Sequence, residues 1–585
     1  MNGRWTSRAA LMGLTSLQAI CLLAVAWGTG PGWDEWGHLP SGLYQLQYGD
    51  PTPYCVNPPL TRLIGAAPVW LAGGGIDYEP LPRSPGFRPE GPLGWLYIVQ
   101  HGERAFTWMS VARTAVIPIA LFGTYLIWMV GTRLFDERTG RIAAALWAFS
   151  PTVLTFGASI TPDATAAVFG LLAAWRFYVW LRIGTINTAW WLGIATGLAM
   201  LSKATWLILP PMMALMTIGY GVICPRRWQW SQRWKQGAGI AAVCWVVIHA
   251  AYEFQGTLVP LEKFEFVSDL LRGDDSSASQ SSSSGNRFRG TWLGRLPSPL
   301  PAAYLRGIDI QKSDFEGRMQ SYFFGQWRDG GWWYYYLVGL WLKEPVALWL
   351  MVVIGLIEWG KQRFRLGNRT RLVARGIVLT PGIALLAFVS SQTGFNHHLR
   401  YVLPFLPCFY LLIAAGVASL RGRRRYLIIA LVVWYAASSL SVLPRSYAYF
   451  TEAIGGPSQG WKYLENSNLD WGQDILTVKA WVEANPDKRP IFFVYSIPII
   501  DFHKLGIDAE HGGPATSPQG PTQPGWWVVC ASPMMRPENR WFREHEPTER
   551  LSVTTSVYYI SPEVAQRNRE ASVNESLTRT TQSGS

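Results

Sequence analysis

Long runs of apolar residues, separated by short polar or basic segments, make up most of the chain. A run of about 17 or more apolar residues is long enough to cross the hydrocarbon core of a bilayer as a helix. One stretch, 189–223, is interrupted at Leu201-Ser202-Lys203 and predicts two short helices. The pattern therefore predicts about eleven membrane helices. They cover residues 11–27, 112–132, 142–161, 164–181, 189–223 as a broken pair, 237–255, 346–359, 376–391, 401–420 and 426–443.

Arginine and lysine residues gather in alternate connections between these runs. They cluster from Arg133 to Arg141, from Lys361 to Arg375 and over 421–425. Cytoplasmic connections of membrane proteins carry an excess of Lys and Arg, so these segments mark the inner side. The N-terminus is then cytoplasmic and the C-terminus extracytoplasmic, in a bacterial-type inner or plasma membrane. Removal of the first run as a signal peptide is the alternative, but that run is long enough to span.

Two large polar segments, 29–110 and 256–332, then lie on the outer side. In the first, apolar residues recur at helical spacing from Leu60 to Leu71, which predicts a short helix lying flat on the membrane. The second contains the Ser-rich run Asp274–Gly285, which lacks the apolar residues of a core and predicts a flexible loop. The aromatic cluster Trp332–Tyr336 is expected at headgroup level, where amphipathic rings are favoured.

The chain changes character after the last apolar run. Residues 444–567 predict a small extracytoplasmic α/β domain, with a helix over 474–484 and strands over 491–495, 526–529 and 553–560. Residues 568–585 predict a disordered tail. The expected fold is thus a polytopic α-helical membrane protein, with a transmembrane catalytic domain over 1–443 and this smaller domain after it.

Composition supports a membrane protein and excludes other classes. The 585 residues are 49% hydrophobic and 15% charged, and they include 32 Trp, which is too apolar for a disordered or ordinary soluble protein. The net charge of +13 lies mainly in the short segments between apolar runs, so it sets topology and indicates no nucleic-acid partner. The six cysteines show no metal-binding spacing; Cys55 and Cys530 are the pair that could meet as a disulfide.

The first candidate chemistry lies seven residues beyond the first span. Asp34 and Glu35, followed by His38, lie where a membrane helix meets water, an expensive place for charge. Partial loss of hydration makes a carboxylate a better proton acceptor, which suits one of the two to act as a general base. A solvated loop whose acids simply mark the outer side is the alternative.

Further charged residues reach outer helix ends in the predicted topology. Each has a simpler explanation: Arg113 at a helix end can snorkel, Asp163 can cap a helix starting at Ala164, and His397-His398 can face different ways without holding a metal. Together, however, acids fall in the first outer segments and cations in later ones. That division suits an acid-activated nucleophile and an anionic leaving group. The set is Asp34, Glu35, His38, Arg113, Asp163, Lys203, Lys343, His397, His398 and Arg400.

The order and spacing of short motifs resembles a known family. The motifs are Asp34-Glu35, Asn57-Pro58-Pro59-Leu60, Arg113, Thr161-Pro162-Asp163 and Asn396-His397-His398-Leu399-Arg400-Tyr401. They resemble the membrane-embedded GT-C glycosyltransferases, most of all family 39, the protein O-mannosyltransferase and aminoarabinose-transferase group. The resemblance covers about residues 10–443. The segments 449–452, 455–457 and Ser467-Asn468-Leu469-Asp470-Trp471-Gly472-Gln473-Asp474 look like a tail found on some bacterial members.

The resemblance implies an inverting transferase that moves a sugar from a polyprenyl-phosphate carrier to a hydroxyl acceptor on the outer face, with no cofactor or metal required. It implies Asp34 as catalytic base, Glu35 as a support for substrate binding and Asp163 as a second acid. Cations beside a leaving phosphate stabilise its developing charge. By resemblance these are Arg113, Lys203, His398 and Arg400. Further candidate substrate contacts are His38, Asn57, Arg62, Lys343 and His397.

One departure from the family pattern concerns the donor. Some relatives carry a basic residue before Pro-Pro, where this chain has Asn57, and Arg62 is a candidate replacement.

Two other functional classes stay open. A transporter or flippase of a lipid-linked anion would use the same cations, but the chain shows no internal repeat. A non-catalytic membrane scaffold leaves the clustered acids unexplained.

Overall fold

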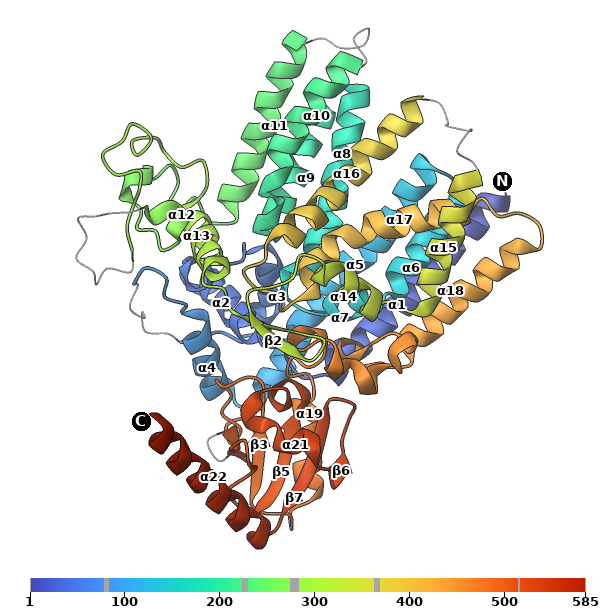
Figure 1. Cartoon of the computed structure of the whole chain (residues 1–585). Coiled ribbons are helices and arrows are strands. Elements are labelled where there is room, and N and C mark those ends of the chain that lie inside the picture. The colour runs from blue at the N-terminus through green and yellow to red at the C-terminus, as the bar shows by residue number, and fades with distance from the viewer. Residues whose placement is uncertain are drawn as a thin grey trace.

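The computed structural model of the protein describes residues 2–77, 84–223, 230–273, 284–361, 369–513 and 516–583. Figure 1 shows a bundle of long helices with the C-terminal sheet at one end of it. The described parts of the polar segments 29–110 and 256–332 lie beside that same end (Figure 1). The predicted Ser-rich loop falls largely on 274–283, outside the described residues.

Six helices in the described part of the chain are long and apolar enough to cross a bilayer. A seventh candidate is a pair, α14 (Tyr335–Lys343) and α15 (Val346–Lys361), bent by 114° at Glu344-Pro345. These helices make the chain a polytopic α-helical membrane protein. The six spans lie in α1 (Asn2–Gly28), α5 (Arg104–Leu134), α8 (Pro162–Ile183), η2 (Ala204–Ile208) with α10 (Leu209–Ile223), α16 (Arg369–Ser391), and η5 (Leu399–Phe405) with α17 (Leu406–Val417).

The other predicted spans correspond to shorter or more polar helices, so the count of eleven stays a prediction. The predicted span 142–161 is divided into α6 (Glu137–Phe149) and α7 (Pro151–Phe156). Ser150 accepts a hydrogen bond from the N–H of Val153 and caps α7, because Pro151 cannot continue the hydrogen-bond ladder of α6. The remaining three are α9 (Ile186–Ser202), α11 (Trp230–Ala250) and α18 (Arg424–Leu440).

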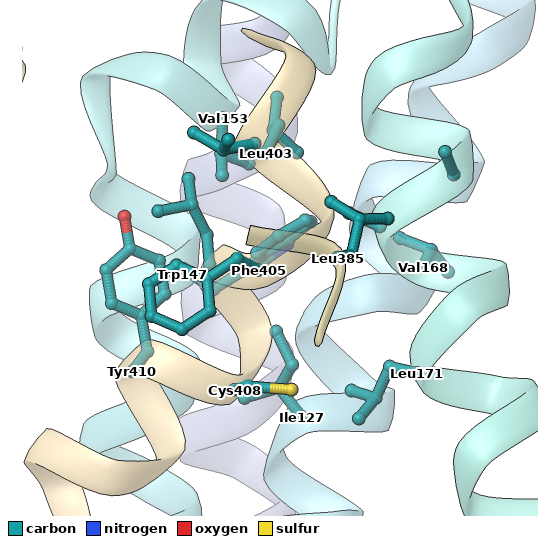
Figure 2. Packing of buried hydrophobic residues seen from close by; sticks show 14 of the residues in the cluster. Ile127, Trp147, Val153, Val168, Leu171, Leu385, Leu403, Phe405, Cys408 and Tyr410 are labelled. Carbon is teal, nitrogen blue, oxygen red and sulfur yellow. The ribbon is translucent and has the colours of Figure 1, made fainter. Parts of the chain in front are cut away.

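The bundle core lies where α5, α6, α8, α16 and α17 meet. Figure 2 shows Trp147 of α6 and Tyr410 and Phe405 of the η5–α17 segment packed beside aliphatic side chains of the neighbouring helices. α5 and α6 approach closely because Gly131 and Gly140 face each other. A Cβ on Gly140 would lie 2.3 Å from Thr132 Oγ1, so the contact depends on small residues.

The first outer segment folds as three helices beside the bundle end: α2 (Glu35–Tyr48), α3 (Leu60–Leu71) and α4 (Glu90–His101). The predicted short helix is therefore present as α3. It buries Gly65, Ala66 and Val69 against α2 and α5, while Leu71 is exposed.

The second outer segment carries α12 (Asp269–Arg272), α13 (Ala302–Glu316) and the hairpin of β1 (Gln320–Phe323) and β2 (Gln326–Asp329). The aromatic cluster that follows is divided between two environments. Trp333 is exposed, but Tyr335 and Tyr336 are buried in the protein core. These two rings therefore face the protein interior, because the start of α14 turns them inward, and the depth of the cluster in the membrane stays a prediction.

The C-terminal part forms a five-stranded mixed sheet in the order β4-β3-β5-β7-β6. β3 pairs in parallel with β4 and β5, whereas β7 is antiparallel to β5 and β6. One face shares a core with α2, α4 and α5, so the sheet is packed against the bundle end. The elements are α19 (Ile475–Ala484), β3 (Ile491–Val494), β4 (Glu510–His511), β5 (Gly525–Cys530), β6 (Glu549–Arg550) and β7 (Thr555–Ile560), close to the predicted helix and strands.

The last described residues form a helix, α22 (Pro562–Ser583), over most of the segment for which the sequence predicts a disordered tail, 568–585. Three side chains attach its first half to a neighbouring loop. Asn568 donates to Pro521 O over 3.0 Å, Arg569 donates to Thr522 O over 2.9 Å, and Ser572 bonds to Ser517 over 2.7 Å. Tertiary contacts of this kind cannot be predicted from the local pattern of a polar sequence.

Candidate functional site

A cavity of about 150 Å³, called the polar cavity below, opens at the end of the bundle nearest the outer segments. Its walls come from the loop after α1, the loop before α3, α13, the start of α8 and the residues around η5. The lining residues are Asp34, Tyr54, Val56, Asn57, Arg88, Pro162, Asp163, Lys203, Gln311, Asp314, Met319, Phe395, His397, His398, Arg400 and Tyr401.

Two acids and two cations form one continuous chain of ion pairs in this cavity. Arg400 Nη2 lies 2.6 Å from Asp34 Oδ2, and its Nη1 lies 3.5 Å from Asp163 Oδ2. Lys203 Nζ lies 2.5 Å from Asp163 Oδ1. Residues separated by up to 366 positions in the sequence are thus brought into direct contact. The structure joins two of the predicted acids, Asp34 and Asp163, to two of the predicted phosphate-binding cations, Lys203 and Arg400.

Local structure explains why these side chains converge. Thr161 is the N-cap of α8 and Pro162 its first residue, so Asp163 lies in the first turn, where the helix dipole favours a carboxylate. α9 ends at Ser202, and Lys203 follows in extended conformation, as the interrupted sequence predicts. Its ammonium lies 4.6 Å from the centre of the Tyr401 ring.

The side chains of the three carboxylates differ in how far they are exposed. The side chain of Asp34 is 22% exposed, whereas those of Asp163 and Glu35 are 1% and 0% exposed. A general base must come within hydrogen-bond reach of the proton it takes. Asp34 meets this requirement in the present conformation, while Asp163 is enclosed by the two cations and is placed to orient them.

Glu35 and Arg113 lie outside the polar cavity and bind each other. Arg113 Nε donates to Glu35 Oε1 over 2.9 Å, and a second pairing joins Nη2 to Oε2. Glu35 also accepts the backbone N–H groups of Gly32 and Ile160 at 2.8 and 3.1 Å. The structure therefore places the predicted supporting acid and the predicted phosphate ligand in a buried pair that attaches the start of α2 to α5.

This pair leads to a stability prediction. Glu35→Leu is expected to lower the free energy of unfolding by about 3–5 kcal/mol, since the buried guanidinium of Arg113 loses its partner. The double change Glu35→Leu with Arg113→Leu is expected to cost less than Glu35→Leu alone. Thermal unfolding of the purified protein in detergent measures both. A Glu35→Leu protein as stable as the wild type but inactive would contradict this role and indicate a direct one in catalysis.

His38 and Arg62 are buried behind the cavity wall rather than in it. His38 packs at a tilt against Tyr54 with 4.4 Å between ring centres, and the Arg62 guanidinium lies 5.6 Å from the centre of the same ring. Arg62 also donates to Asn57 O over 2.6 Å. Burial, followed by the charge of Arg62, holds the pKa of His38 well below its usual value. Asn57 does line the polar cavity, next to Tyr54.

Lys343 is also buried away from the cavity. Its ammonium donates to the carbonyl groups of Tyr447 and Asn468 at 2.8 and 2.5 Å and lies 4.3 Å from the centre of the Phe450 ring. It therefore holds the segment after α18 against α14.

The two histidines line the cavity through different bonds. His397 Nε2 lies 2.5 Å from Gln320 O, and His398 Nδ1 lies 2.7 Å from Ser467 Oγ. Burial lowers the pKa of His397, and burial followed by the charge of Arg400 holds that of His398 well below its ordinary value. Within the described ranges, no group of three His, Cys, Asp or Glu residues is arranged to hold a metal.

The structure adds residues that the sequence analysis missed. Arg88 and Asp314 form an ion pair in the cavity wall, and Tyr54 contributes a ring. Trp471 packs its face against Arg400, 4.3 Å from ring centre to guanidinium carbon. No sequence periodicity marks these residues as part of a site. For Trp471 the recognised motif 467–474 is the available signal, and it indicates a tail rather than the site.

The possible disulfide is not formed. Cys55 and Cys530 are both free thiols. Cys530 is fully buried in β5, next to Thr555 Oγ1 at 3.6 Å, while Cys55 donates to Thr52 O in the outer loop.

Comparisons with known proteins relate the chain to glycosyltransferases. Residues 97–252 match the family model described as dolichyl-phosphate-mannose-protein mannosyltransferase. Structural similarity extends to ArnT from Cupriavidus metallidurans bound to undecaprenyl phosphate, with 13% identity over 93% of this chain and 97% of that chain and a TM-score of 0.44. No curated protein matches the sequence.

Two further structures are similar at the same level. The Pmt1-Pmt2 protein O-mannosyltransferase complex of S. cerevisiae, bound to the sugar donor, shows 12% identity over 74% of this chain and 89% of that chain, with a TM-score of 0.44. The oligosaccharyltransferase AglB from Archaeoglobus fulgidus, in complex with an inhibitory peptide and a dolichol-phosphate, shows 12% identity over 90% and 70%, with a TM-score of 0.43.

Proposed function

We propose that the protein, whose residues 97–252 match a mannosyltransferase family model, is a membrane glycosyltransferase of the GT-C, family-39-like group that moves a sugar from a polyprenyl-phosphate carrier to a hydroxyl acceptor. Two cavities that share a wall support this proposal. A substrate that joins a phosphate to a long hydrocarbon chain needs a charged site directly beside an apolar one. The acceptor is a protein, a glycan or a lipid.

The second cavity, of about 220 Å³ and called the apolar cavity below, shares Lys203, Gln311 and Tyr401 with the polar cavity. Its other walls are mostly hydrocarbon. They include Ala204, Leu207, Ile208, Ile308, Phe315, Phe388 and Val389. A prenyl chain in this cavity would place its phosphate at Lys203. This adjacency is the observation that carries the proposal.

The proposed reaction is a single inverting displacement. Asp34 takes the proton of the acceptor hydroxyl, and the acceptor oxygen forms a bond to the anomeric carbon of the sugar. The bond from that carbon to the phosphate oxygen breaks, and polyprenyl phosphate leaves with the electron pair. Lys203 and Arg400 stabilise the charge that develops on the leaving oxygen. The reaction needs no metal, since side chains neutralise the single phosphate.

Lys203 and Arg400 bind carboxylates and still have donors for a phosphate. An ammonium offers three N–H donors and a guanidinium five. The carboxylates of Asp34 and Asp163 keep both cations compensated until the donor arrives, which avoids buried unpaired charge.

A third cavity, of about 370 Å³, adjoins the polar cavity on the side of the outer segments. The segments 52–57, 84–89 and 306–314 contribute residues to both. Its lining combines charged side chains, such as Lys263, Glu265 and Arg306, with prolines and Phe87. A polar, hydroxyl-bearing acceptor suits such a lining. We place the acceptor on this side and the lipid in the apolar cavity.

The basic residues support an extracytoplasmic site with the N-terminus inside. Arg113 and Arg133 belong to the same helix, α5, and are 20 residues apart, so about 30 Å separates them along its axis. That distance is roughly the thickness of a bilayer core. Arg138, Arg141 and Arg425 line one groove at the far end, where the positive-inside rule expects cytoplasm.

The direct test uses the purified full chain with a labelled polyprenyl-phosphate sugar and a panel of hydroxyl acceptors. Transfer of the label to an acceptor supports the proposal. No release to any acceptor, including an extract of the cell envelope, would falsify it. The glycan missing from a deletion strain identifies the acceptor class.

The apolar cavity leads to a second prediction. Leu207→Asn is expected to raise the KM for a long-chain donor roughly tenfold, because a buried apolar contact is worth about 1–2 kcal/mol. A donor with a short, water-soluble prenyl chain is expected to show little change. Leu215→Asn, on the same helical segment but 71% exposed at the bundle surface, is the matched control. Equal effects on both donors would contradict a prenyl chain at Leu207.

A further inference from the structure

A turn formed by residues 467–474, between α18 and α19, reaches the loop that carries Arg400. Ser467 Oγ lies 2.7 Å from His398 Nδ1. Asn468 Oδ1 accepts the N–H of Leu399 over 2.9 Å, and its Nδ2 donates to His397 O over 2.8 Å. This 467–474 turn therefore fixes the backbone and the imidazole immediately before Arg400.

The same turn binds the loop that carries Asp34. The N–H of Trp33 donates to Trp471 O over 3.1 Å, and that of Gly30 donates to Gln473 O over 2.7 Å. Gly32 lies directly against the indole of Trp471. A Cβ at Gly32 would lie 2.4 Å from Trp471 Cε3, so the approach of the two segments requires glycine there.

Trp471 lies between the two segments that the turn contacts, the one before Arg400 and the one that carries Asp34. Its side chain is 3% exposed, and its ring face lies 4.3 Å from the guanidinium carbon of Arg400. A cation held over an aromatic face in a dry site is attracted by the ring and restricted in position. Arg400 is thus held by Trp471 on one side and by Asp34 and Asp163 on the other.

The C-terminal sheet holds the turn itself. Asp470 Oδ2 accepts bonds from Ser532 N and Ser496 Oγ at 3.1 and 3.0 Å. Asp474 Oδ2 accepts bonds from the hydroxyls of Thr554 and Thr555 at 2.6 and 2.8 Å. Both carboxylates are 1% exposed. A buried, fully bonded turn is rigid, because each lost bond would leave a polar group unpaired.

From these contacts we infer that the 467–474 turn is a clamp that positions Arg400 against Asp34, with Trp471 as its principal positioning residue. The C-terminal sheet then contributes to catalysis by holding the clamp, through a part of the chain outside the helical bundle. This inference rests on the proposed function, in which Arg400 stabilises the leaving phosphate. It assigns a role to the motif 467–474, none of whose residues takes part directly in the proposed transfer.

The first test replaces Trp471 in the full chain. Trp471→Leu removes the aromatic face and is expected to lower kcat about 100-fold with little change in donor KM, because misplaced catalytic groups cost on that order. Trp471→Phe keeps a ring and is expected to recover most of the activity. The control is Trp526→Leu in β5, a partly buried tryptophan that packs on Trp481 and Tyr559 and belongs to a different hydrophobic cluster from Trp471.

The control decides between positioning and general loss of folding. Near-normal kcat in Trp526→Leu, with loss in Trp471→Leu, supports the clamp. Similar losses in both variants, or a Trp471→Leu protein with normal kcat, overturn it.

A second test uses the contact between Gly32 and Trp471. Gly32→Ala pushes the indole and is expected to lower kcat about tenfold or more. In the Trp471→Phe background, which lacks the outer indole ring atoms nearest Gly32, the same change is expected to cost less than about threefold. Contacting residues show such non-additivity, whereas independent ones add. Additive effects would show that Gly32 and Trp471 act separately and would overturn the clamp.

A readout without catalysis separates this inference from the proposed function. Arg400 is 4% exposed, so an arginine-selective dicarbonyl reagent should modify it slowly in the wild type, as measured by mass spectrometry. Trp471→Leu is expected to increase this modification several-fold and Trp526→Leu to leave it unchanged. If the wild type transfers no sugar, the proposed function fails, but this labelling result still decides whether Trp471 holds Arg400. Unchanged labelling in Trp471→Leu counts against the clamp.

Discussion

Asp34→Asn is expected to reduce sugar transfer by about 10²- to 10⁴-fold, the usual contribution of a general base. Asparagine has nearly the same shape and keeps an oxygen for the Arg400 guanidinium, which lies 2.6 Å from Asp34 Oδ2 in the wild type. The amide, however, takes up no proton from the acceptor. We therefore expect kcat to fall while donor binding and thermal stability stay close to the wild type. Steady-state kinetics with the labelled donor measure the loss.

Asp163→Asn provides the comparison for this result. Asp163 binds both Lys203 and Arg400 and is 1% exposed, so its replacement is expected to weaken donor binding and lower stability as well as rate. If Asp34→Asn retains full transfer, Asp34 is not the base. If Asp34→Asn and Asp163→Asn change rate, donor binding and stability in the same way, the two residues do not have the different roles assigned to them, Asp34 as base and Asp163 as the residue that orients the cations.

Arg400→Lys is expected to lower kcat about 10²- to 10³-fold, the scale for removing one preorganised donor at a developing oxyanion. Lysine keeps the charge, but its single ammonium lacks the planar fork with which Arg400 reaches Asp34 and Asp163 together. The Trp471 face also loses the flat guanidinium that packs on it. Single-turnover kinetics with bound donor separate this loss from weaker binding.

Arg489→Lys is the matched control for charge and shape. Arg489 pairs with Asp508 over 2.7 Å on the surface of the C-terminal part, and both side chains are partly exposed. Exposed pairs contribute about 0–1 kcal/mol, so transfer should be unchanged within about twofold. Full activity of Arg400→Lys would show that positive charge alone is sufficient and would contradict the bridging role.

The sequence predicted the membrane class and several details of the site. Apolar run lengths indicated the spans, and the break at Leu201–Lys203 is present in the structure. The match of residues 97–252 to a mannosyltransferase family model agrees with the recognised motifs in that range, Arg113 and Thr161-Pro162-Asp163. The depth of a residue follows from its place in an apolar run, so the sequence alone predicts Asp34, Asp163, Lys203 and Arg400 on one side of the membrane.

Other predicted site residues show that depth in the membrane does not fix whether a side chain points into the polar cavity. Glu35 is adjacent to Asp34 in the sequence, yet it points to Arg113 instead of the polar cavity. Lys343 lies at an outer helix end as predicted but is bound by backbone carbonyl groups. Arg62 is buried behind Tyr54. In each case the direction of the side chain around its own helix or loop, which no single-sequence pattern specifies, removed the residue from the cavity.

The sequence by itself determined that the chain enters the membrane repeatedly, which ends of its spans carry acids and cations, and which family its motifs resemble. These features depend on hydrophobic length, charge placement and local spacing, all of which are properties of short segments. Only the tertiary structure decided which acid is accessible, which ion pairs are purely buried supports, and that Trp471 lies on Arg400. Those outcomes depend on long-range packing, which fixes helix rotation and brings segments hundreds of residues apart into contact.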